Sequence, residues 1–381
     1  MKKLVILLHG PLYKNMKGEI ISQGGQDGQL IELSRYYKTT IYSPIIEKDV
    51  NGNKFPTNIT VRQLFIRKSD SIIDLLNNYR RYRNKIQRIL ITERDSIFLA
   101  ILPGKYLGLL YAHLLKRSHK KQVFRIVNDE GSAVGKRSDK RVIRKIIAPF
   151  FKLTFNTIVN YLIKDGLNIY TGNIIYNKHT HINQYSVVSS SINESIVRHT
   201  KDKKIQDKIL FVGYLEPKKG ADYLLEAMKN LKHKKLTIVG DGPFKKKLER
   251  LKERYQLDNV EFLGYIPFGD TLLDIYRDHD LLIMPSLEER QGKVHLEAMS
   301  QGTVPIVTDV GGVYTVIKNN YNGIMIPPHN STAIVRAVNL LYSDQKLYFR
   351  LRKNGYFTAK NNTIEKQIML MKELIDNRYG E

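Results

Sequence analysis

Residues 280–312 read DLLIMPSLEERQGKVHLEAMSQGTVPIVTDVGG, and this stretch carries the strongest structural signal in the chain. Apolar runs at Leu281–Met284 and Val304–Thr308 predict two buried strands, connected by a loop and a short helix. Gly292 and Gly302 stand where the backbone must turn or approach another group closely. Strand, loop, helix and strand in this order are typical of a parallel α/β sheet, in which ligands bind at the carboxyl ends of the strands.

Two carboxylates in this stretch are candidates for a functional site. Glu289 lies in the loop, and Glu297 lies in the helix eight residues later. Both side chains can therefore face one crevice above the strand ends.

Length and composition limit the class of protein. The 381 residues predict two domains, and 42% apolar with 26% charged residues is ordinary for a soluble globular enzyme. The absence of cysteine excludes disulfides and thiolate metal sites. No apolar stretch approaches the roughly 20 residues of a spanning helix. The short apolar run in Met1–Gly10 predicts a first buried strand rather than a secretory signal.

The net charge of +25, with a pI of about 9.8, lies far outside the magnitude of about 2–8 that is usual for a small domain. A positive field of this size concentrates polyanions, which could be nucleic acid, an anionic bilayer or phosphorylated substrates. The alternative is a solvated surface in a lysine-rich protein.

Strands that alternate with helices predict a doubly wound parallel sheet in the first part of the chain. The loop Gly10–Gly28 contains the sequence GGQDG, in which Gly25 is a candidate for contact with an anion. A purely structural turn is the alternative, because the strict dinucleotide fingerprint is absent.

Acidic residues follow two further predicted strands of this part. Arg88–Ile91 is followed closely by Glu93, and Val123–Val127 is followed by Asn128, Asp129 and Glu130. These carboxylates could act at the carboxyl edge of the sheet or simply cap the next helix.

The stretch from Lys136 to Lys164 is strongly basic and has apolar pairs about every four residues, with Pro149 dividing it into two predicted helices. A basic amphipathic helix can lie on an anionic membrane, and a core-facing helix with a solvated basic back is the alternative. The candidates for contact with a membrane or an acceptor are Lys140, Arg141, Arg144 and Lys145.

The polar run Asn193–Asp207 lacks apolar periodicity and predicts a linker at residues 193–207. We therefore expect a first domain at residues 1–192 and a second at residues 208–360. The last helix, within residues 361–381, is expected to pack back on the first domain.

Motifs of the second domain follow one another in a specific order. They are VGYLEPKKG at Val212–Gly220, GDGP at Gly240–Pro243, FLGYIP at Phe262–Pro267, PSLEERQGKVHLEAMSQGTVPIVT at Pro285–Thr308, and NGIMIPP at Asn322–Pro328. Together they resemble the nucleotide-sugar half of retaining glycosyltransferases of family four (glycosyl transferases group 1). That family has the GT-B fold, with two Rossmann-like, doubly wound parallel-sheet domains that face a central cleft. The resemblance covers Ile209 to about Leu341, and the first domain matches only in architecture.

The resemblance implies roles for individual residues. Glu297 would hold the ribose hydroxyls of a sugar nucleotide and Glu289 would contact the donor hexose, since the family's spacing selects Glu289 over Glu288. A carboxylate accepts hydroxyl hydrogen bonds well, whereas the alternative for Glu297 is a first-turn glutamate favoured by the helix dipole. The helix that begins near Gly292 can point free N–H groups at a diphosphate, and Lys219 can reach it as a point charge.

The sequence departs from the family pattern at three places. Tyr214 replaces an arginine, so a diphosphate contact is lost or is supplied by Lys218. Arg290 and Gln291 replace a glycine and a phenylalanine and would crowd or recharge the hexose pocket. Asp129 is the candidate where many members carry a histidine near the reacting carbon. The remaining donor-binding candidates are Gly213, Gly240, Gly242, Lys293 and Val294.

The resemblance implies a retaining glycosyltransferase that moves a hexose or an N-acetylhexosamine from a nucleoside diphosphate sugar, preferably a UDP-sugar, to an acceptor hydroxyl. No cofactor and no metal are expected, because cations and helix N–H groups can hold the leaving diphosphate. The basic first domain suggests a lipid-linked or surface-glycan acceptor in bacterial cell-envelope polysaccharide biosynthesis. We expect a cytoplasmic protein, peripheral on the inner face of the cytoplasmic membrane.

Two other functions fit parts of the sequence. A GT-B nucleotide-sugar epimerase or phosphorylase would share the donor motifs. The net charge would suit a nucleic-acid-binding protein, although the chain lacks a recognisable basic-aromatic recognition module and its motifs suit a small anionic ligand.

Overall fold

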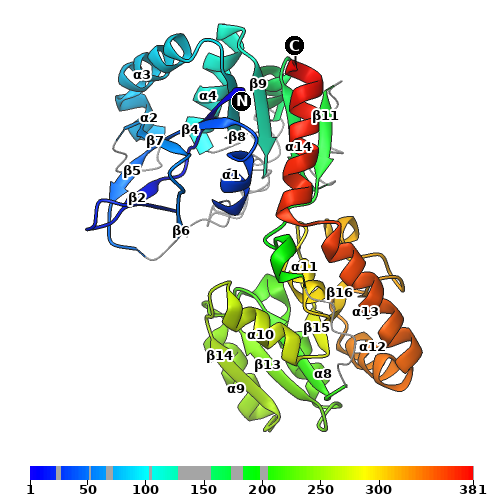
Figure 1. Ribbon diagram of the computed structural model, residues 1–381. Helices are drawn as coiled ribbons and strands as arrows, with labels where there is room; N and C mark the ends of the chain where they lie inside the picture. The colour runs from blue at the N-terminus through cyan, green and yellow to red at the C-terminus, as the bar shows by residue number, and fades with distance from the viewer. Residues whose placement is uncertain are drawn as a thin grey trace. The chain divides into compact units, whose positions relative to one another are not determined.

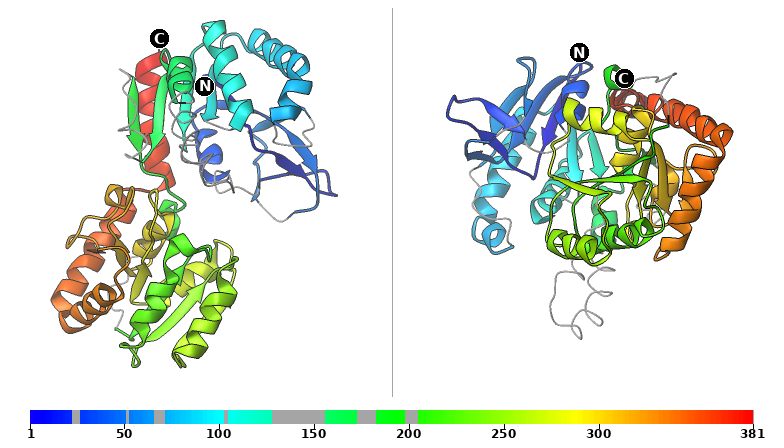
Figure 2. Two further views of the ribbon diagram at one scale, coloured as in Figure 1. Left: turned by 180° about the vertical axis from the view of Figure 1, so that it is seen from behind. Right: turned by 90° about the horizontal axis from the view of Figure 1, so that it is seen from below.

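The chain folds into two compact units in a computed structural model, Met1–Val187 with Ile368–Glu381, and Val188–Gln367. Each unit contains a parallel sheet with helices around it (Figures 1 and 2). No helix in the described part of the chain is both long and apolar enough to cross a membrane. The structure describes residues 1–22, 27–50, 53–65, 72–102, 105–127, 156–172, 183–197 and 205–380.

The first unit is built on a seven-stranded sheet in the order β11-β10-β9-β8-β1-β4-β7, with every pairing parallel. The doubly wound sheet expected here is confirmed. Its strands are β1 (Lys3–Leu7), β4 (Lys38–Ser43), β7 (Thr60–Gln63), β8 (Ile97–Leu102), β9 (Gln122–Ile126), β10 (Leu167–Thr171) and β11 (Gln184–Val187).

A second, four-stranded sheet occupies part of the region predicted as a glycine-containing loop. It has the order β5-β2-β3-β6, formed by β2 (Leu12–Lys14), β3 (Ile20–Ser22), β5 (Ile45–Glu47) and β6 (Asn53–Lys54). The prediction of a continuous loop over Gly10–Gly28 was therefore wrong. Strands of two or three residues bury too few side chains to produce a readable alternation.

Helices cover both faces of the large sheet of the first unit. Phe124 of β9 belongs to one core cluster with residues of α3 and α4, whereas the neighbouring Arg125 donates to Gln29 of α1. Alternate residues of a strand point to opposite faces, so α1 lies on the other side of the sheet from α3 and α4. The helices are α1 (Asp27–Leu33), α2 (Ile72–Asn77), α3 (Tyr79–Thr92) and α4 (Lys105–Ser118), and residues 156–163 are also helical.

The strand predicted at Arg88–Ile91 was wrong, because these residues are the last turn of α3. Tyr82, Ile86 and Ile89 are buried at helical spacing, whereas a four-residue window cannot separate a helix from a strand. Glu93 caps this helix. Its buried carboxylate pairs with Lys3 and accepts a hydrogen bond from Tyr42 at 3.2 Å, so Glu93 takes the structural role rather than the functional one.

The second unit is a six-stranded, fully parallel sheet in the order β14-β13-β12-β15-β16-β17. Its elements lie close to the predicted ranges, because each apolar run is bounded by a glycine, a proline or a charged turn. The strands are β12 (Lys208–Val212), β13 (Lys235–Val239), β14 (Val260–Gly264), β15 (Leu281–Met284), β16 (Val304–Thr308) and β17 (Ile324–Ile326).

Helices of the second unit pack as two sets. α8 (Ala221–Met228) contacts α9 (Lys245–Arg254) and α12 (Ser331–Ser343). α11 (Lys293–Ser300) contacts α10 (Asp270–Asp278) and α13 (Gln345–Lys360). Strand order reverses between β12 and β15, which makes the carboxyl edge beside these two strands the place where a doubly wound sheet binds its ligand.

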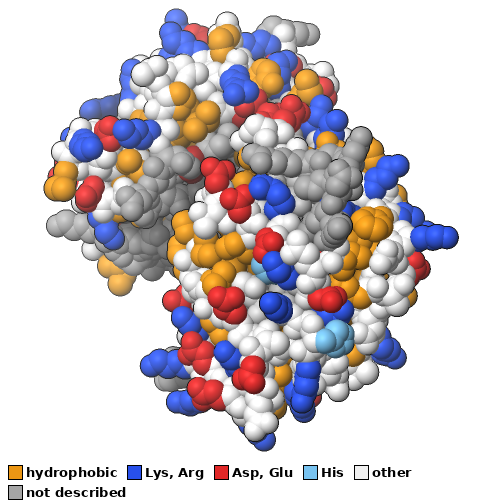
Figure 3. All heavy atoms as spheres, turned by 60° about the horizontal axis from the view of Figure 1, so that its bottom comes forward, with side chains coloured by type: hydrophobic (Ala, Val, Ile, Leu, Met, Phe, Trp, Pro, Cys, Tyr) orange, Lys and Arg blue, Asp and Glu red, His pale blue; other side chains and the backbone are white. Residues whose placement is uncertain are grey.

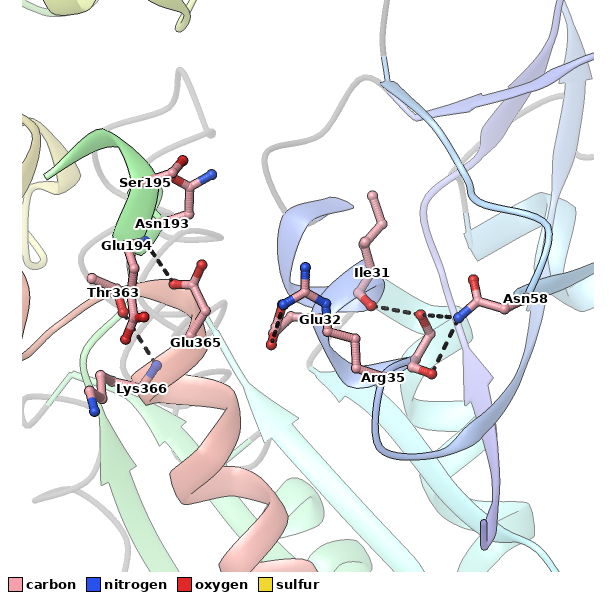
Figure 4. A network of polar contacts seen from close by, with 11 residues as sticks. Ile31, Glu32, Arg35, Asn58, Asn193, Glu194, Ser195, Thr363, Glu365 and Lys366 are labelled. Atoms are coloured by element: carbon pink, nitrogen blue, oxygen red, sulfur yellow. Dashed lines mark hydrogen bonds and ion pairs between the residues drawn. The ribbon is translucent and has the colours of Figure 1, made fainter.

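The units divide between Val187 and Val188, ahead of the linker predicted at residues 193–207. The residues that follow are already bonded within the second unit, since Ile364 donates its N–H to the carbonyl of Ile192 at 2.8 Å. Figure 4 shows the next bond, from the backbone N–H of Glu194 to the carboxylate of Glu365 at 3.1 Å. Contacts with α14 (Ile364–Tyr379) thus hold Ile192 and Glu194, where the segment predicted as a linker begins.

The second division falls inside α14, between Gln367 and Ile368. The later turns of this helix belong to the first unit. There, Tyr379 donates to the carbonyl of Gln122 at 2.7 Å, and Asp376 accepts a hydrogen bond from Tyr37 at 3.3 Å.

Candidate functional site

The loops that follow β12 and β15 meet at the point where the strand order reverses. Leu287 donates its backbone N–H to the carbonyl of Lys218 at 2.7 Å, which ties the two loops together. Gly220 has a φ of 66°, and a Cβ atom there would overlap the carbonyl oxygen of Pro285. Only glycine allows the two backbones to come this close.

The loop after β13 stacks on the loop after β12 in the same way. A Cβ atom at Gly240 would collide with the carbonyl oxygen of Gly213, and one at Gly242 with that of Leu215. Leu215 also donates its N–H to the carbonyl of Asp241 at 2.9 Å. Packing thus requires glycine at the predicted donor-binding positions Gly240 and Gly242, because the two loops contact each other there.

Lys219 and Glu289 form an ion pair at this edge of the sheet, with 2.6 Å between Nζ and Oε2. Both residues are half-buried. Burial alone would raise the pKa of Glu289, but the charge of Lys219 and its hydrogen bond outweigh burial and hold this pKa below its usual value. Glu289 is therefore an ionised carboxylate with a fixed counter-ion.

The neighbours of this pair are engaged differently. Lys218 pairs with Glu216 of its own loop at 2.9 Å. Tyr214, where the family has an arginine, and Glu288 are both exposed. Lys219 is thus the lysine of its loop that faces the carboxylate loop, and Lys218 pairs locally.

α11 begins directly after Gly292, whose φ of 76° turns the chain into the helix. Lys293 and Val294 form its first turn, where backbone N–H groups have no partner within the helix. The buried ring of His295 lies against Gly292, so that a Cβ atom there would overlap the ring. Glycine at position 292 therefore makes room for the His295 ring at the start of the helix.

The carboxylate of Glu297 is buried and oriented by two hydroxyl groups. Ser191 donates to Oε1 at 2.5 Å, and Tyr276 of α10 donates to Oε2 at 2.9 Å. Burial raises the pKa of Glu297, against the hydrogen bonds from Ser191 and Tyr276 and the charge of Lys293. No local pattern in the sequence pointed to Ser191 or Tyr276, because Ser191 lies far from Glu297 along the chain.

Gln291 is buried and makes two hydrogen bonds with the backbone of Ser189. Ser189 donates its N–H to Oε1 at 3.0 Å, and Nε2 donates to the carbonyl of Ser189 at 3.4 Å. An amide side chain offers one donor and one acceptor in the spacing that a backbone needs, so Gln291 is fixed by Ser189. Its effect on a hexose pocket stays a prediction. Arg290 is exposed.

Part of the second unit matches a known family of proteins. Residues 193–357 match the family model described as glycosyl transferases group 1. This part of the second unit is therefore similar to group 1 glycosyltransferases, and we call it the group 1 domain. Its ion pair, its buried Glu297 and its glycine-supported loops all lie within this domain.

Curated relatives match mainly over the group 1 domain. A protein of Methanocaldococcus jannaschii that is named as an uncharacterized glycosyltransferase is 42% identical over 142 residues, which are 36% of this chain and 36% of that protein. The D-inositol 3-phosphate glycosyltransferase of Salinispora tropica is 30% identical over 187 residues, which are 45% of this chain and 38% of that protein. The chain spans about a third to a half of the length of the curated relatives it matches.

Solved structures are similar over the whole chain. The sucrose-phosphate synthase of Thermosynechococcus elongatus has a TM-score of 0.74 at 17% identity, with 100% of both chains covered. Anabaena HepE, in complex with UDP, has a TM-score of 0.71 at 15% identity, with 99% of this chain and 100% of that chain covered. At these identities the likeness shows the fold, which is GT-B with two Rossmann-like domains, as the sequence predicted.

Several predicted residues outside the group 1 domain lie outside the described residues. They are Gly25, Asp129, Lys140, Arg141, Arg144 and Lys145. Their roles in anion contact, catalysis and membrane or acceptor contact stay predictions.

His295 makes the stability of the group 1 domain sensitive to acid. Burial lowers its pKa from 6.5 to about 4, although the charge of Glu289 acts in the opposite direction. As the pH falls, the imidazole of His295 is protonated in the unfolded chain before it is protonated in the folded protein. The stabilisation of the folded protein by neutral His295 is therefore complete above about pH 6.5 and is lost as the pH falls towards about 4. The loss is on the order of 3 kcal/mol.

We expect His295→Leu to flatten the pH dependence of the free energy of unfolding between about pH 6.5 and pH 4. Urea unfolding at several pH values measures this slope. His233→Leu is the matched control, because His233 is exposed in the same unit. An unchanged slope in His295→Leu would show that another group controls the acid limb.

Proposed function

We propose that this protein is a retaining glycosyltransferase that transfers a hexose or an N-acetylhexosamine from a nucleoside diphosphate sugar to an acceptor hydroxyl. The observation that carries the proposal is the ion pair of Lys219 and Glu289 beside the first turn of α11, with Glu297 in the same helix. A cation and the N–H groups of a helix N-terminus suit a diphosphate, and two carboxylates suit the hydroxyls of ribose and hexose.

Glu297 is the proposed ribose ligand. Each of its oxygens already accepts one protein hydrogen bond, and a carboxylate has about four acceptor positions, so capacity for two ribose hydroxyls remains. Ser191 and Tyr276 hold the carboxylate in place and spare it the cost of being buried without partners.

Glu289 and Lys219 are proposed to act on the reacting end of the donor. In the transfer, the bond between the anomeric carbon and the diphosphate oxygen breaks and a bond to the acceptor oxygen forms. The proton of the acceptor hydroxyl passes to the leaving diphosphate. Lys219 and the first N–H groups of α11 would stabilise the charge that develops on the leaving diphosphate. Retention is carried over from the family's motifs, and no metal or cofactor is part of the proposal.

The nucleotide is proposed to be UDP. Anabaena HepE, whose fold this chain shares, was solved with UDP and with UDP-glucose. A lipid-linked or surface glycan is the proposed acceptor, and the inner face of the cytoplasmic membrane is the proposed location. Two further proteins of this fold support a glycan acceptor, namely the lipopolysaccharide outer core galactosyltransferase WaaB and WaaG of lipopolysaccharide biosynthesis.

A thermal-shift panel of UDP-, GDP- and ADP-sugars tests the donor. At a concentration of about 100 times Kd, a bound donor stabilises the protein by about 2.7 kcal/mol, and we expect a shift with UDP-sugars alone. Lys219→Met should lose most of this shift, whereas Lys246→Met, on the exposed face of α9, should keep it. Equal shifts with all three nucleotides, or none, would contradict the proposed donor.

A further inference from the structure

The first unit carries large aliphatic side chains that it does not cover. Ile73 and Leu76 of α2 are 65% and 66% exposed, and Ile91 at the end of α3 is 73% exposed. Leu75, between the first two, packs against the core cluster of this unit. The exposed side chains therefore belong to the outward side of these helices.

α2 leads into α3 at Asn78, the N-cap of α3, whose φ of −109° and ψ of 9° depart from helical values. Asn78, between them, donates its N–H to the carbonyl of Asp74 at 3.1 Å and accepts the N–H of Tyr82 at 2.9 Å, as residues four apart do in a helix. Within α2, Ile73 and Leu76 lie three residues apart and are both exposed. Within α3, helical spacing places Arg80, Arg88 and Ile91 on one exposed side, and Arg81 is exposed as well.

The charge on this side has a single sign. α3 contains Arg80, Arg81, Arg83, Lys85 and Arg88 and no acidic residue. No carboxylate in the described ranges pairs with Arg80, Arg81 or Arg88. The single acid of the two helices, Asp74, is half-buried and accepts hydrogen bonds from Asn78 and Tyr82.

We infer that these residues dock the first unit on an anionic phospholipid bilayer. We call Ile73, Leu76, Arg80, Arg81, Arg88 and Ile91 the α2–α3 surface. Arginines in the middle suit lipid phosphates, and aliphatic groups at both ends suit insertion into the boundary between headgroups and acyl chains. A nucleic-acid partner would bind the arginines but would make little use of the uncovered aliphatic groups on either side of them.

The inference is local and independent of the donor chemistry proposed above. Figure 3, which brings forward the bottom of Figure 1, shows acidic and basic side chains interspersed on the face that it draws. α9 is also basic, but Glu249 and Glu253 stand among its lysines and arginines, and Leu248 is its one buried residue. Among the described residues, the arginines of the α2–α3 surface have no carboxylate partner, and they stand beside exposed aliphatic side chains.

Vesicle binding tests the inference on the full chain. We expect co-sedimentation with phosphatidylcholine vesicles that contain about 30 mol% phosphatidylglycerol, and little with phosphatidylcholine alone. Arg80→Gln/Arg81→Gln/Arg88→Gln should weaken partition at least about thirtyfold, because each basic residue near the surface contributes about fivefold. Ile73→Ser/Leu76→Ser should weaken it about tenfold.

The matched control removes the same charge from another basic helix. Lys246→Gln/Arg250→Gln/Arg254→Gln in α9, where all three residues are exposed, should weaken partition less than about threefold. Circular dichroism melting confirms that each variant folds, and an unchanged thermal shift with the donor separates lost docking from lost donor binding.

Three results would overturn the inference. Equal weakening by the α9 control would mean that diffuse net charge attracts the protein. If Ile73→Ser/Leu76→Ser binds vesicles as well as the unmodified protein does, these aliphatic side chains do not insert into the bilayer. If the protein does not bind vesicles but binds random duplex DNA, and the triple arginine variant loses that binding, the surface is a nucleic-acid site.

Discussion

Glu297→Ala is expected to lower both donor affinity and the stability of the second unit. Removal of the carboxylate leaves the buried hydroxyl of Tyr276 without its acceptor, which costs about 1–3 kcal/mol in the free energy of unfolding. Loss of the ribose hydrogen bonds should raise the Kd of a UDP-sugar by about 5- to 150-fold. Urea unfolding measures the first effect, and calorimetric titration measures the second.

Tyr276→Phe separates these two effects. It removes the hydroxyl that orients Glu297 and keeps the carboxylate, so we expect a stability loss of about 1 kcal/mol and a smaller change in donor affinity than in Glu297→Ala. If Glu297→Ala binds UDP-sugars as the unmodified protein does, the carboxylate has only the structural role that its hydrogen bonds to Ser191 and Tyr276 already give it.

Gly311→Ala is expected to destabilise the second unit by about 3 kcal/mol or more. Gly311 has a φ of 60°, and a Cβ atom there would overlap the carbonyl oxygen of Glu289. The next residue, Gly312, donates its N–H to that same carbonyl at 3.1 Å, so the loop after β16 holds the backbone of the carboxylate loop. The alanine must displace the backbone of Glu289, whose side chain pairs with Lys219, so donor binding should fall together with stability.

Gly269→Ala is the control for this substitution. Gly269 lies at the start of α10 in the same unit, and a Cβ atom there meets nothing within 4 Å. We expect a change of less than about 1 kcal/mol in the free energy of unfolding. If Gly311→Ala is as mild as this control, the loop after β16 moves freely and does not position Glu289.

Helices and strands were readable from the sequence where runs are long and clearly bounded. β15, α11 and β16 lie almost where the stretch 280–312 predicts them, because glycines and a proline separate two apolar runs from one short helix. In the first unit, the last turn of α3 was taken for a strand, and β2 and β3 were missed. Windows of three or four residues do not hold enough side chains to distinguish the two periodicities.

The candidate site was predictable residue by residue but not as an arrangement. Lys219, Glu289 and Glu297 stand out from the sequence because family motifs mark them. The structure alone pairs Lys219 with Glu289, and it alone shows that Gln291 holds the backbone of Ser189.

The sequence by itself determined the GT-B class and the residues of the group 1 domain that merit testing, because local spacing carries that information. Only the tertiary structure decided which side chains meet, that Ser191 and Tyr276 orient Glu297, and that the outward side of α2 and α3 is left uncovered. The physical reason is that such contacts depend on the order of strands in the sheets and on which helix face packs inward, and neither can be read from neighbours along the chain.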